Sequence, residues 1–185
     1  MLKICLTLVC TLYGLSAVGQ EHAAYTTQNG TVHFSSVAPL EVIEAKSDHL
    51  QGVLDPAQNT FAFRLENRSF TGFNSALQKE HFNENYMESS RYRFTTFKGR
   101  IIESVDVSMD GTYSVRAKGV LSLHGIQQER IIKCDLKMVG DKILVKARFT
   151  ILLEEYDIVV PRIVQQKIAP EILVNVEATL LKDRP

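Results

Sequence analysis

FTGFNSALQKEHFNENYMESSRYRFTTFKG, residues 70–99, is the stretch that interrupts an otherwise β-rich chain. The extended pattern resumes at Tyr92, after a polar segment of helical character at residues 75–87. Ser75 and Gln78, three positions apart, fit the capping box that satisfies free backbone N–H groups at a helix start. The stretch therefore predicts one short α-helix inserted between strands.

The predicted helix has an apolar stripe and a charged face. Apolar side chains recur at Leu77, Phe82, Tyr86 and Met87. Glu80, Glu84 and Glu88 fall on another face. Because a short, Asn-rich helix is marginal by itself, it must be held by packing.

The remaining chain alternates apolar and polar residues with period two, which is typical of strands with one buried face. In residues 60–67, for example, Phe61, Phe63 and Leu65 share one face. We expect extended segments at residues 24–37, 41–46, 60–67, 91–97, 100–109, 113–123, 132–138, 143–151 and 172–180. We expect breaks at Gly30 and Gly99, turn chemistry across residues 48–56, and turns at Asp110-Gly111, His124-Gly125 and Gly140-Asp141.

About eight strands at hairpin spacing with one inserted helix indicate an all-β, antiparallel sandwich or barrel. One face of each strand is apolar and the other charged, as expected when one face lines an interior. An eight-stranded barrel is wide enough to be filled by side chains or to hold one small ligand. Strand count alone does not decide between these two states.

The N-terminus has the features of a secretory signal peptide over residues 1–19. Lys3 precedes an apolar run at residues 4–15, and Ala17-Val18-Gly19 places small residues before a cut at Gln20. The run is shorter than the roughly 20 residues of a membrane-spanning helix. We therefore expect an exported protein, periplasmic or secreted, without an integral membrane span, whose single domain covers residues 20–185.

Charge and cysteine content limit the classes of function. The chain has 21 basic and 21 acidic residues, so no basic field favours nucleic acid as a partner. After cleavage Cys134 would be the one remaining cysteine, on an apolar face with Ile132, Leu136 and Met138. Reactive thiols need a cationic or helix N-terminal setting, so this pattern predicts a buried, inert thiol.

Two histidines are candidates for chemistry. His81-x-x-Glu84 has the spacing of an acid/base pair or part of a metal site. A catalytic zinc needs three protein ligands, and no HExxH motif or Cys pair supplies them, so we expect no metal, cofactor or catalytic residue. His124 precedes Gly125 where the chain reverses, which favours a structural turn role over a place at a cavity mouth.

Three stretches resemble the YceI-like family of secreted, lipocalin-like barrels. The first is EHFNENYMES at residues 80–89, followed by Tyr92 and the FKG at residues 97–99. The second is GVLSLHGI at residues 119–126, similar to a strand and turn of the family. The third is Tyr156-Asp157-Ile158 before the last strand.

This resemblance implies an eight-stranded antiparallel lipocalin-like barrel with one short inserted α-helix near its mouth. Some family members bind polyisoprenoid or other amphiphilic chains. Phe82, Tyr86 and Met87 would then face the barrel, and His81 and Glu84 would face water or the rim.

The leading hypothesis is a non-catalytic binding protein, monomeric or homodimeric, that holds an apolar or amphiphilic small molecule in the barrel. Aromatic and aliphatic side chains on inward faces are the candidates for ligand contact: Phe61, Phe63, Phe82, Tyr86, Tyr92, Phe94, Leu121, Leu123, Phe149, Ile151, Val174 and Val176. The alternatives are a filled barrel that acts as an interaction module and, least favoured, an enzyme using His81 and Glu84.

Overall fold

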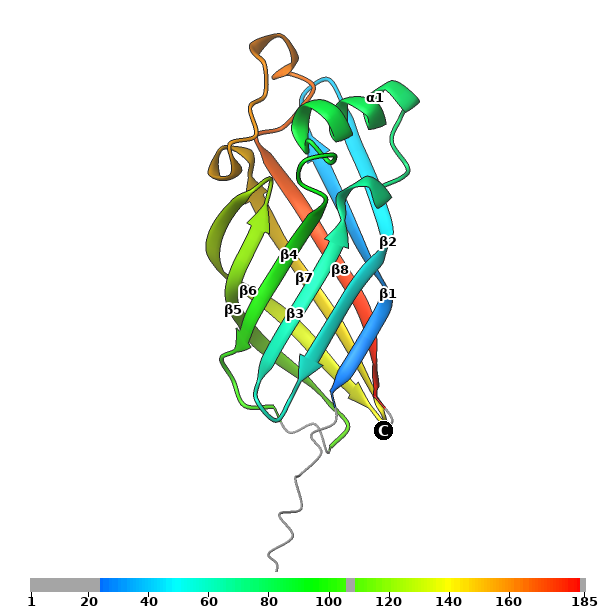
Figure 1. Ribbon diagram of the computed structural model, residues 1–185, viewed down its shortest axis with the longest axis vertical. Helices are drawn as coiled ribbons and strands as arrows, with labels where there is room; N and C mark the ends of the chain where they lie inside the picture. The colour runs from blue at the N-terminus through cyan, green and yellow to red at the C-terminus, as the bar shows by residue number, and fades with distance from the viewer. Residues whose placement is uncertain (1–23, 106–108, 184–185) are drawn as a thin grey trace, which may run out of the picture.

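Eight antiparallel strands close into a single barrel in the computed structural model, which describes residues 24–105 and 109–183 (Figure 1). Each strand pairs with the next in the chain, and the last pairs with the first. The strands are β1 Tyr25–Val37, β2 Val42–Asp55, β3 Thr60–Glu66, β4 Phe94–Ile101, β5 Gly111–Leu123, β6 Ile126–Val139, β7 Lys142–Leu152 and β8 Glu171–Lys182. The predicted eight-stranded barrel is confirmed.

Alternation of burial, most regular in β6, explains why these segments form the wall. In β6, Ile132, Cys134, Leu136 and Met138 are buried while the residues between them are exposed. Successive side chains of a strand point to opposite faces, so the apolar set lines the interior. The predicted period-two faces of β3 and β8 are observed in the same way.

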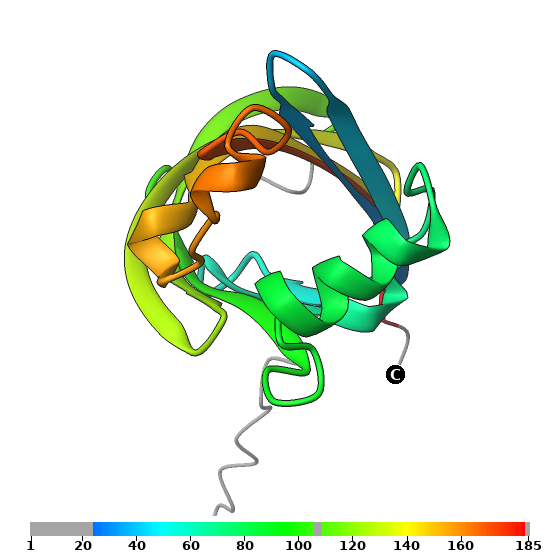
Figure 2. The ribbon, with the colours of Figure 1, turned by 90° about the horizontal axis from the view of Figure 1, so that it is seen from above.

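The helical insertion lies at one end of the barrel, which we call the upper end (Figure 2). α1 spans Ala76–His81 and continues as a π-helical turn over Phe82–Tyr86. Short 3-10 helices lie at Asn67–Ser69, Leu153–Tyr156 and Arg162–Val164. Within residues 24–105 and 109–183, no helix has the length and apolar character needed to span a bilayer.

The predicted cap of α1 is present with one difference. Ser75 accepts a hydrogen bond from the backbone N–H of Gln78, at 3.1 Å. The side-chain oxygen of Gln78 accepts from the N–H of Asn74 at 3.0 Å, not from that of Ser75 as a capping box would require. The first turn is therefore capped, but its return bond reaches one residue further back.

Of two predicted interruptions, the break at Gly30 is absent, and the turn predicted across residues 48–56 forms only at its Asp55-Pro56 end, where residues 56–59 turn and Asp55 accepts hydrogen bonds from the N–H groups of Ala57 and Gln58. β2 runs without a break through residues 48–55, and β1 runs through Gly30 with register shifts on either side of it. Asp48 suggested a turn, yet its carboxylate accepts from the Thr31 hydroxyl at 2.9 Å on the outer face. Gly52 suggested a turn as well, but the ring of Phe63 occupies the place its side chain would fill. Asp48 and Gly52 therefore take part in the pairing of β2 with its neighbouring strands instead of forming a turn.

Strand β4 also differs from the prediction. It passes through Gly99 and ends at Ile101, so residues 102–105 and 109–110 lie outside strands, and the rest of the predicted strand at residues 100–109 falls outside the described residues. Gly99 pairs with Gly119 of β5, and a Cβ on Gly99 would lie 2.1 Å from the carbonyl oxygen of Lys118. The glycine allows a close approach of two backbones. It does not end the strand.

The predicted Asp110-Gly111 hairpin is likewise not formed. Gly111 is already the first residue of β5, and Asp110 accepts a hydrogen bond from the backbone N–H of Gly140 at 2.8 Å. The predicted turns at His124-Gly125 and Gly140-Asp141 are confirmed, each with its glycine at positive φ.

Candidate binding cavity

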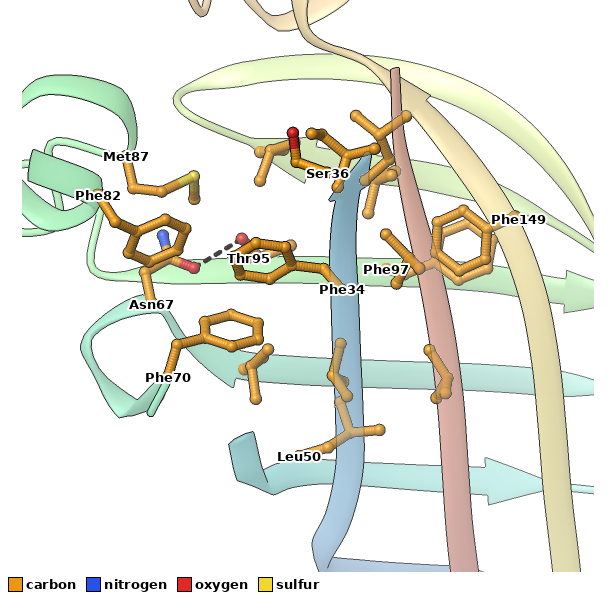
Figure 3. A pocket seen from close by; sticks show the side chains of 18 of the residues that line it. Phe34, Ser36, Leu50, Asn67, Phe70, Phe82, Met87, Thr95, Phe97 and Phe149 are labelled. Carbon is orange, nitrogen blue, oxygen red and sulfur yellow. Dashed lines mark hydrogen bonds between the residues drawn. The ribbon is translucent and has the colours of Figure 1, made fainter. Parts of the chain in front are cut away.

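A cavity of about 600 Å³ occupies the upper part of the barrel (Figure 3). All eight strands contribute inward-facing side chains to its lining, which is almost entirely apolar. Exposed residues of α1 and of the segment after β7, among them His81 and Lys167, also border it. The cavity therefore reaches the surface at the upper end, and we call this opening the mouth.

Four phenylalanines from three segments form an aromatic cluster below the mouth. The Phe34 ring of β1 stacks on Phe82 of the π-helical turn, with ring centroids 5.5 Å apart. Phe70 meets Phe34 edge-on at 5.1 Å, and Phe73 lies 5.1 Å from Phe82. Such ring pairs stabilise by about 1 kcal/mol each beyond area burial. The helix is thus held over the barrel by packing, as its short length requires.

The π-helical turn decides which side chains of this segment face the cavity. The N–H of Met87 donates to the carbonyl of Phe82, five residues earlier, at 2.8 Å. In a regular α-helix, residues five apart point in different directions, because each residue turns by about 100°. The wider turn brings Phe82, Tyr86 and Met87 to one face, and all three line the cavity. Burial raises the pKa of the Tyr86 hydroxyl.

Two polar groups of the lining are paired with each other. Asn67 is fully buried and donates from Nδ2 to the backbone carbonyl of Tyr92 at 2.7 Å. Its Oδ1 accepts from the Thr95 hydroxyl at 2.7 Å, the bond dashed in Figure 3. A buried amide needs such partners. These bonds join the start of the insertion to β4.

His124 joins three segments outside the cavity. It turns β5 into β6 at φ 50°, which confirms the predicted turn role. Its Nδ1 donates to the carbonyl oxygen of Tyr156 at 2.9 Å, and its Nε2 lies 3.1 Å from a carboxylate oxygen of Glu88. The Tyr92 ring packs edge-on against the imidazole at 4.8 Å. His124 therefore ties the end of the helical insertion to the barrel.

Ten of the twelve predicted ligand contacts line the cavity. They are Phe61, Phe63, Phe82, Tyr86, Leu121, Leu123, Phe149, Ile151, Val174 and Val176. Tyr92 packs on His124, and its ring fills the space beside Gly125. Phe94 is on the outer face of β4, beneath the guanidinium groups of Arg64 and Arg93.

Strand parity explains the difference for Phe94. Thr95 and Phe97 line the cavity, so the alternating residues Phe94 and Thr96 point outward. An aromatic side chain favours burial, but here two guanidinium groups lie over the ring, within 5.5 Å of its centroid. The placement of Phe94 on an apolar inner face is therefore wrong.

Several lining residues were not among the predicted ligand contacts, notably Phe34, Leu50, Asn67 and Phe97. Phe34 alternates with Val32 and Ser36, a signal that was available from the sequence. An inward position for Leu50 was not predicted, because residues 48–56 have the composition of a turn. For Asn67, no sequence pattern indicates that an amide beside a 3-10 helix is fully buried.

The candidates for chemistry fall in three different settings. His81 borders the mouth, and Glu84 is exposed and not part of the cavity lining. No three His, Cys, Asp or Glu side chains of the described residues are grouped so as to hold a metal ion. Cys134 is buried as predicted, and burial raises the pKa of its thiol to about 11. Its side chain lines the cavity wall.

Comparison with known proteins agrees with this architecture. A polyisoprenoid binding domain from Saccharophagus degradans, implicated in plant cell wall breakdown, superposes with a TM-score of 0.73 at 12% identity, covering 88% of this chain and 100% of that one. BcnA of Burkholderia cenocepacia gives a TM-score of 0.66 at 14% identity, over 82% and 95% of the two chains. The YceI protein of Campylobacter jejuni gives 0.54 at 12% identity, over 100% and 92%.

At these identities the structural matches establish a shared fold alone. A search of curated proteins found no match. The model of one family, described as the YceI-like domain, matches residues 17–180, which is most of the chain and all eight strands up to the last residues of β8. The chain therefore belongs to the YceI-like family.

Proposed function

We propose that this protein is an exported, non-catalytic binding protein that holds one long apolar or amphiphilic molecule inside its barrel. The observation that carries the proposal is the cavity of about 600 Å³ with an almost wholly apolar lining and a mouth beside α1. Ligand pockets in proteins range over about 300–1,000 Å³. Burial of a hydrocarbon chain is favourable by about 25 cal/mol per Å² of apolar surface removed from water.

A polyisoprenoid is one candidate of this chemical class. The related domain from Saccharophagus degradans is named for binding such molecules, and it shares the barrel fold with this chain. A chain of repeated, branched apolar units suits a lining of Phe, Leu, Ile and Val side chains. Export would rest on residues 1–19, which lie outside the described residues.

The size of the cavity speaks against a filled barrel that acts only as an interaction module. Such a barrel would have side chains where this structure has an open interior. The enzyme alternative needs His81 and Glu84 to act on one substrate. His81 borders the mouth while Glu84 faces water, so the pair does not converge on the cavity.

Occupation of the cavity is tested by native mass spectrometry and by lipid extraction of the purified protein. We expect a bound apolar molecule, and uptake of the uncharged fluorophore N-phenylnaphthylamine after the molecule is removed. Ala147 lines the cavity, so A147W should fill part of it and reduce uptake by about tenfold or more.

The matched control is L144W, because Leu144 lies on the same strand with its side chain on the opposite face. It should take up the fluorophore like the unmodified protein. H81Q should also retain uptake if His81 is only a rim residue. A protein that carries no extractable molecule and takes up no fluorophore would contradict the proposal.

A further inference from the structure

Large apolar side chains are exposed on two segments beside the mouth. In the segment between β7 and β8, Ile163 is 92% exposed and Val159 76% exposed. In the tip that joins β1 to β2, Val37 is 67% exposed and Leu40 66% exposed. A soluble barrel has no need to present four such side chains at one end, and clustered exposure of this kind marks an interaction site.

The two segments form one surface. The N–H of Leu40 donates to the carbonyl of Gln166 at 2.9 Å, and the N–H of Ala169 donates to the Ser36 hydroxyl at 2.8 Å. Both segments stand at the upper end of the barrel, and residues 159–168 lie across the barrel rim from α1 (Figure 2). We call residues 37–42 together with residues 159–168 the mouth face.

Charge on the mouth face has one dominant sign. Residues 158–170 carry Arg162 and Lys167 and no acidic residue. The one carboxylate of the hairpin tip, Glu41, accepts a hydrogen bond from Gln78 of α1 at 3.0 Å and is thus engaged by the helix. Other exposed acidic residues at this end lie outside the mouth face. Glu80 and Glu84 are on the helix side of the mouth, Glu154 and Asp157 precede residues 159–168, and Glu171 follows them.

Apolar side chains interspersed with cations suit the interface of a lipid bilayer. Aliphatic groups can enter the boundary between headgroups and acyl chains, while Arg and Lys pair with anionic headgroups. The surface is continuous with the cavity, because Val164, Lys167 and Ile168 border both. A protein partner would also cover apolar groups, but the charged side chains that lie between the exposed apolar ones of residues 159–168, Arg162 and Lys167, are both cations.

We propose that the mouth face docks on the surface of an anionic lipid bilayer, with Ile163, Val159 and Leu40 inserted and Arg162 and Lys167 at the headgroups. An apolar molecule then moves between bilayer and cavity without crossing water. This route for the ligand rests on the proposed function. The docking itself does not.

The absence of tryptophan from the chain allows a local test. I163W and L40W each place a single fluorophore on the mouth face. I131W is the matched control, because Ile131 is 59% exposed on the outer wall of β6, away from the mouth. Vesicles of phosphatidylcholine and phosphatidylglycerol, with brominated phosphatidylcholine as quencher, report which position enters the bilayer.

We expect a blue shift and quenching for I163W and L40W and neither for I131W. Because each aliphatic side chain contributes independently, I163D should weaken vesicle binding by about tenfold or more, and I131D should not. R162Q should weaken it by about fivefold, and pure phosphatidylcholine vesicles should bind less than the anionic ones. Each tryptophan reports whether its own position enters the bilayer. Membrane binding by the predicted apolar segment at residues 4–15 would therefore not produce the same result.

Three results would overturn docking: unchanged fluorescence of I163W and L40W, equal quenching of I131W, or self-association through this face without vesicle binding. N-phenylnaphthylamine uptake separates this inference from the proposed function. Uptake without docking overturns only the inference. Docking without uptake supports the inference and contradicts the proposed function.

Discussion

The two ends of the barrel are built from the same residue types, yet one is solid and the other hollow. At the lower end, Tyr25, Val115, Met138, Ile143 and Leu180 are buried and fill the interior; none of them lines the cavity. At the upper end, inward side chains of the same strands border an open space of about 600 Å³. Alternation along the strands therefore predicts which side chains face inward, but not whether those side chains pack together and fill the interior.

The arrangement of the aromatic rings accounts for much of the difference. Phe34, Phe70, Phe73 and Phe82 pack on one another below the mouth. Phe61 packs on Phe63 and on Phe97 along the wall of β3 and β4, at centroid distances of 6.1 and 4.9 Å. The opposite wall presents one ring, that of Phe149, among smaller side chains such as Ala147, Val174 and Val176. Rings that stack along one wall leave the space before the other wall open.

The largest expected effect comes from truncating a side chain at the solid end. L180A should lower the free energy of unfolding by about 4 kcal/mol, because Leu180 is fully buried and its removal leaves a closed void. L50A is the counterpart at the hollow end. L50A should lower the free energy of unfolding by only about 2 kcal/mol, because Leu50 already borders a cavity and has fewer packing partners to lose.

Urea unfolding followed by circular dichroism measures both variants, with the slope of the transition as a check on two-state behaviour. Equal losses for L180A and L50A would mean that the upper end is as well packed as the lower. The distinction between solid and hollow ends would then be wrong.

A second prediction tests whether the wall around the cavity can accommodate an added methyl group, as an open cavity could. G99A should destabilise by about 3 kcal/mol, since the new Cβ would meet the backbone of Lys118 and Gly119, which cannot move as a side chain can. Phe97 and Ile101, on either side of Gly99, both line the cavity. The same measurement with G111A serves as control, because a Cβ there makes only ordinary contacts, the nearest being 3.4 Å from Tyr113. If G99A lowered the free energy of unfolding no more than G111A does, the backbones of β4 and β5 would be able to move apart at this position.

These contrasts also explain what the sequence could reveal. The eight strands, the insertion and most of the inward positions follow from period-two alternation, which is a local signal. The turn predicted for residues 48–54 is wrong because Asp48 and Gly52 have turn propensity, while their actual partners, Thr31 and Phe63, come from neighbouring strands. Pairing between strands overrode local preference.

The candidate cavity was predictable only in part for a related reason. Ten lining residues followed from alternation and the family resemblance, but Phe94 shows that an aromatic residue at a strand start can face outward when arginines cover it. The π-helical turn orients Phe82 and Met87, and it depends on a backbone hydrogen bond that the residue pattern does not indicate. Hollowness depends on how side chains from distant segments meet, and no single segment encodes it.

A third prediction concerns the attachment of the insertion to the hollow end. H124A should cost about 2 kcal/mol, because it removes the hydrogen bonds to Tyr156 and Glu88 and places alanine at φ 50°. H124N tolerates that backbone conformation and should cost about half as much. If the insertion shapes the mouth, H124A should also change the rate of N-phenylnaphthylamine uptake. H33A, on the outer face of β1, should change neither property; a similar loss in H33A would mean that His124 has no special role.

The smallest effect tests burial within the cavity wall, at Cys134. C134A should cost about 1 kcal/mol at neutral pH, the loss expected for one small apolar group. The thiol has a pKa of about 11 in the folded protein and 9.0 without burial, so its contribution is complete below pH 9 and is lost as pH rises toward 11. At about pH 10 the unmodified protein should have lost on the order of 1 kcal/mol relative to C134A, which brings the two to nearly equal stability. Urea unfolding of both proteins between pH 7 and 10 measures this difference, and other titrating groups cancel in the comparison. If the difference in free energy of unfolding between the two proteins stayed constant with pH, the thiol would be in contact with water. The apolar wall around Cys134 would then be hydrated, contrary to what its side chains predict.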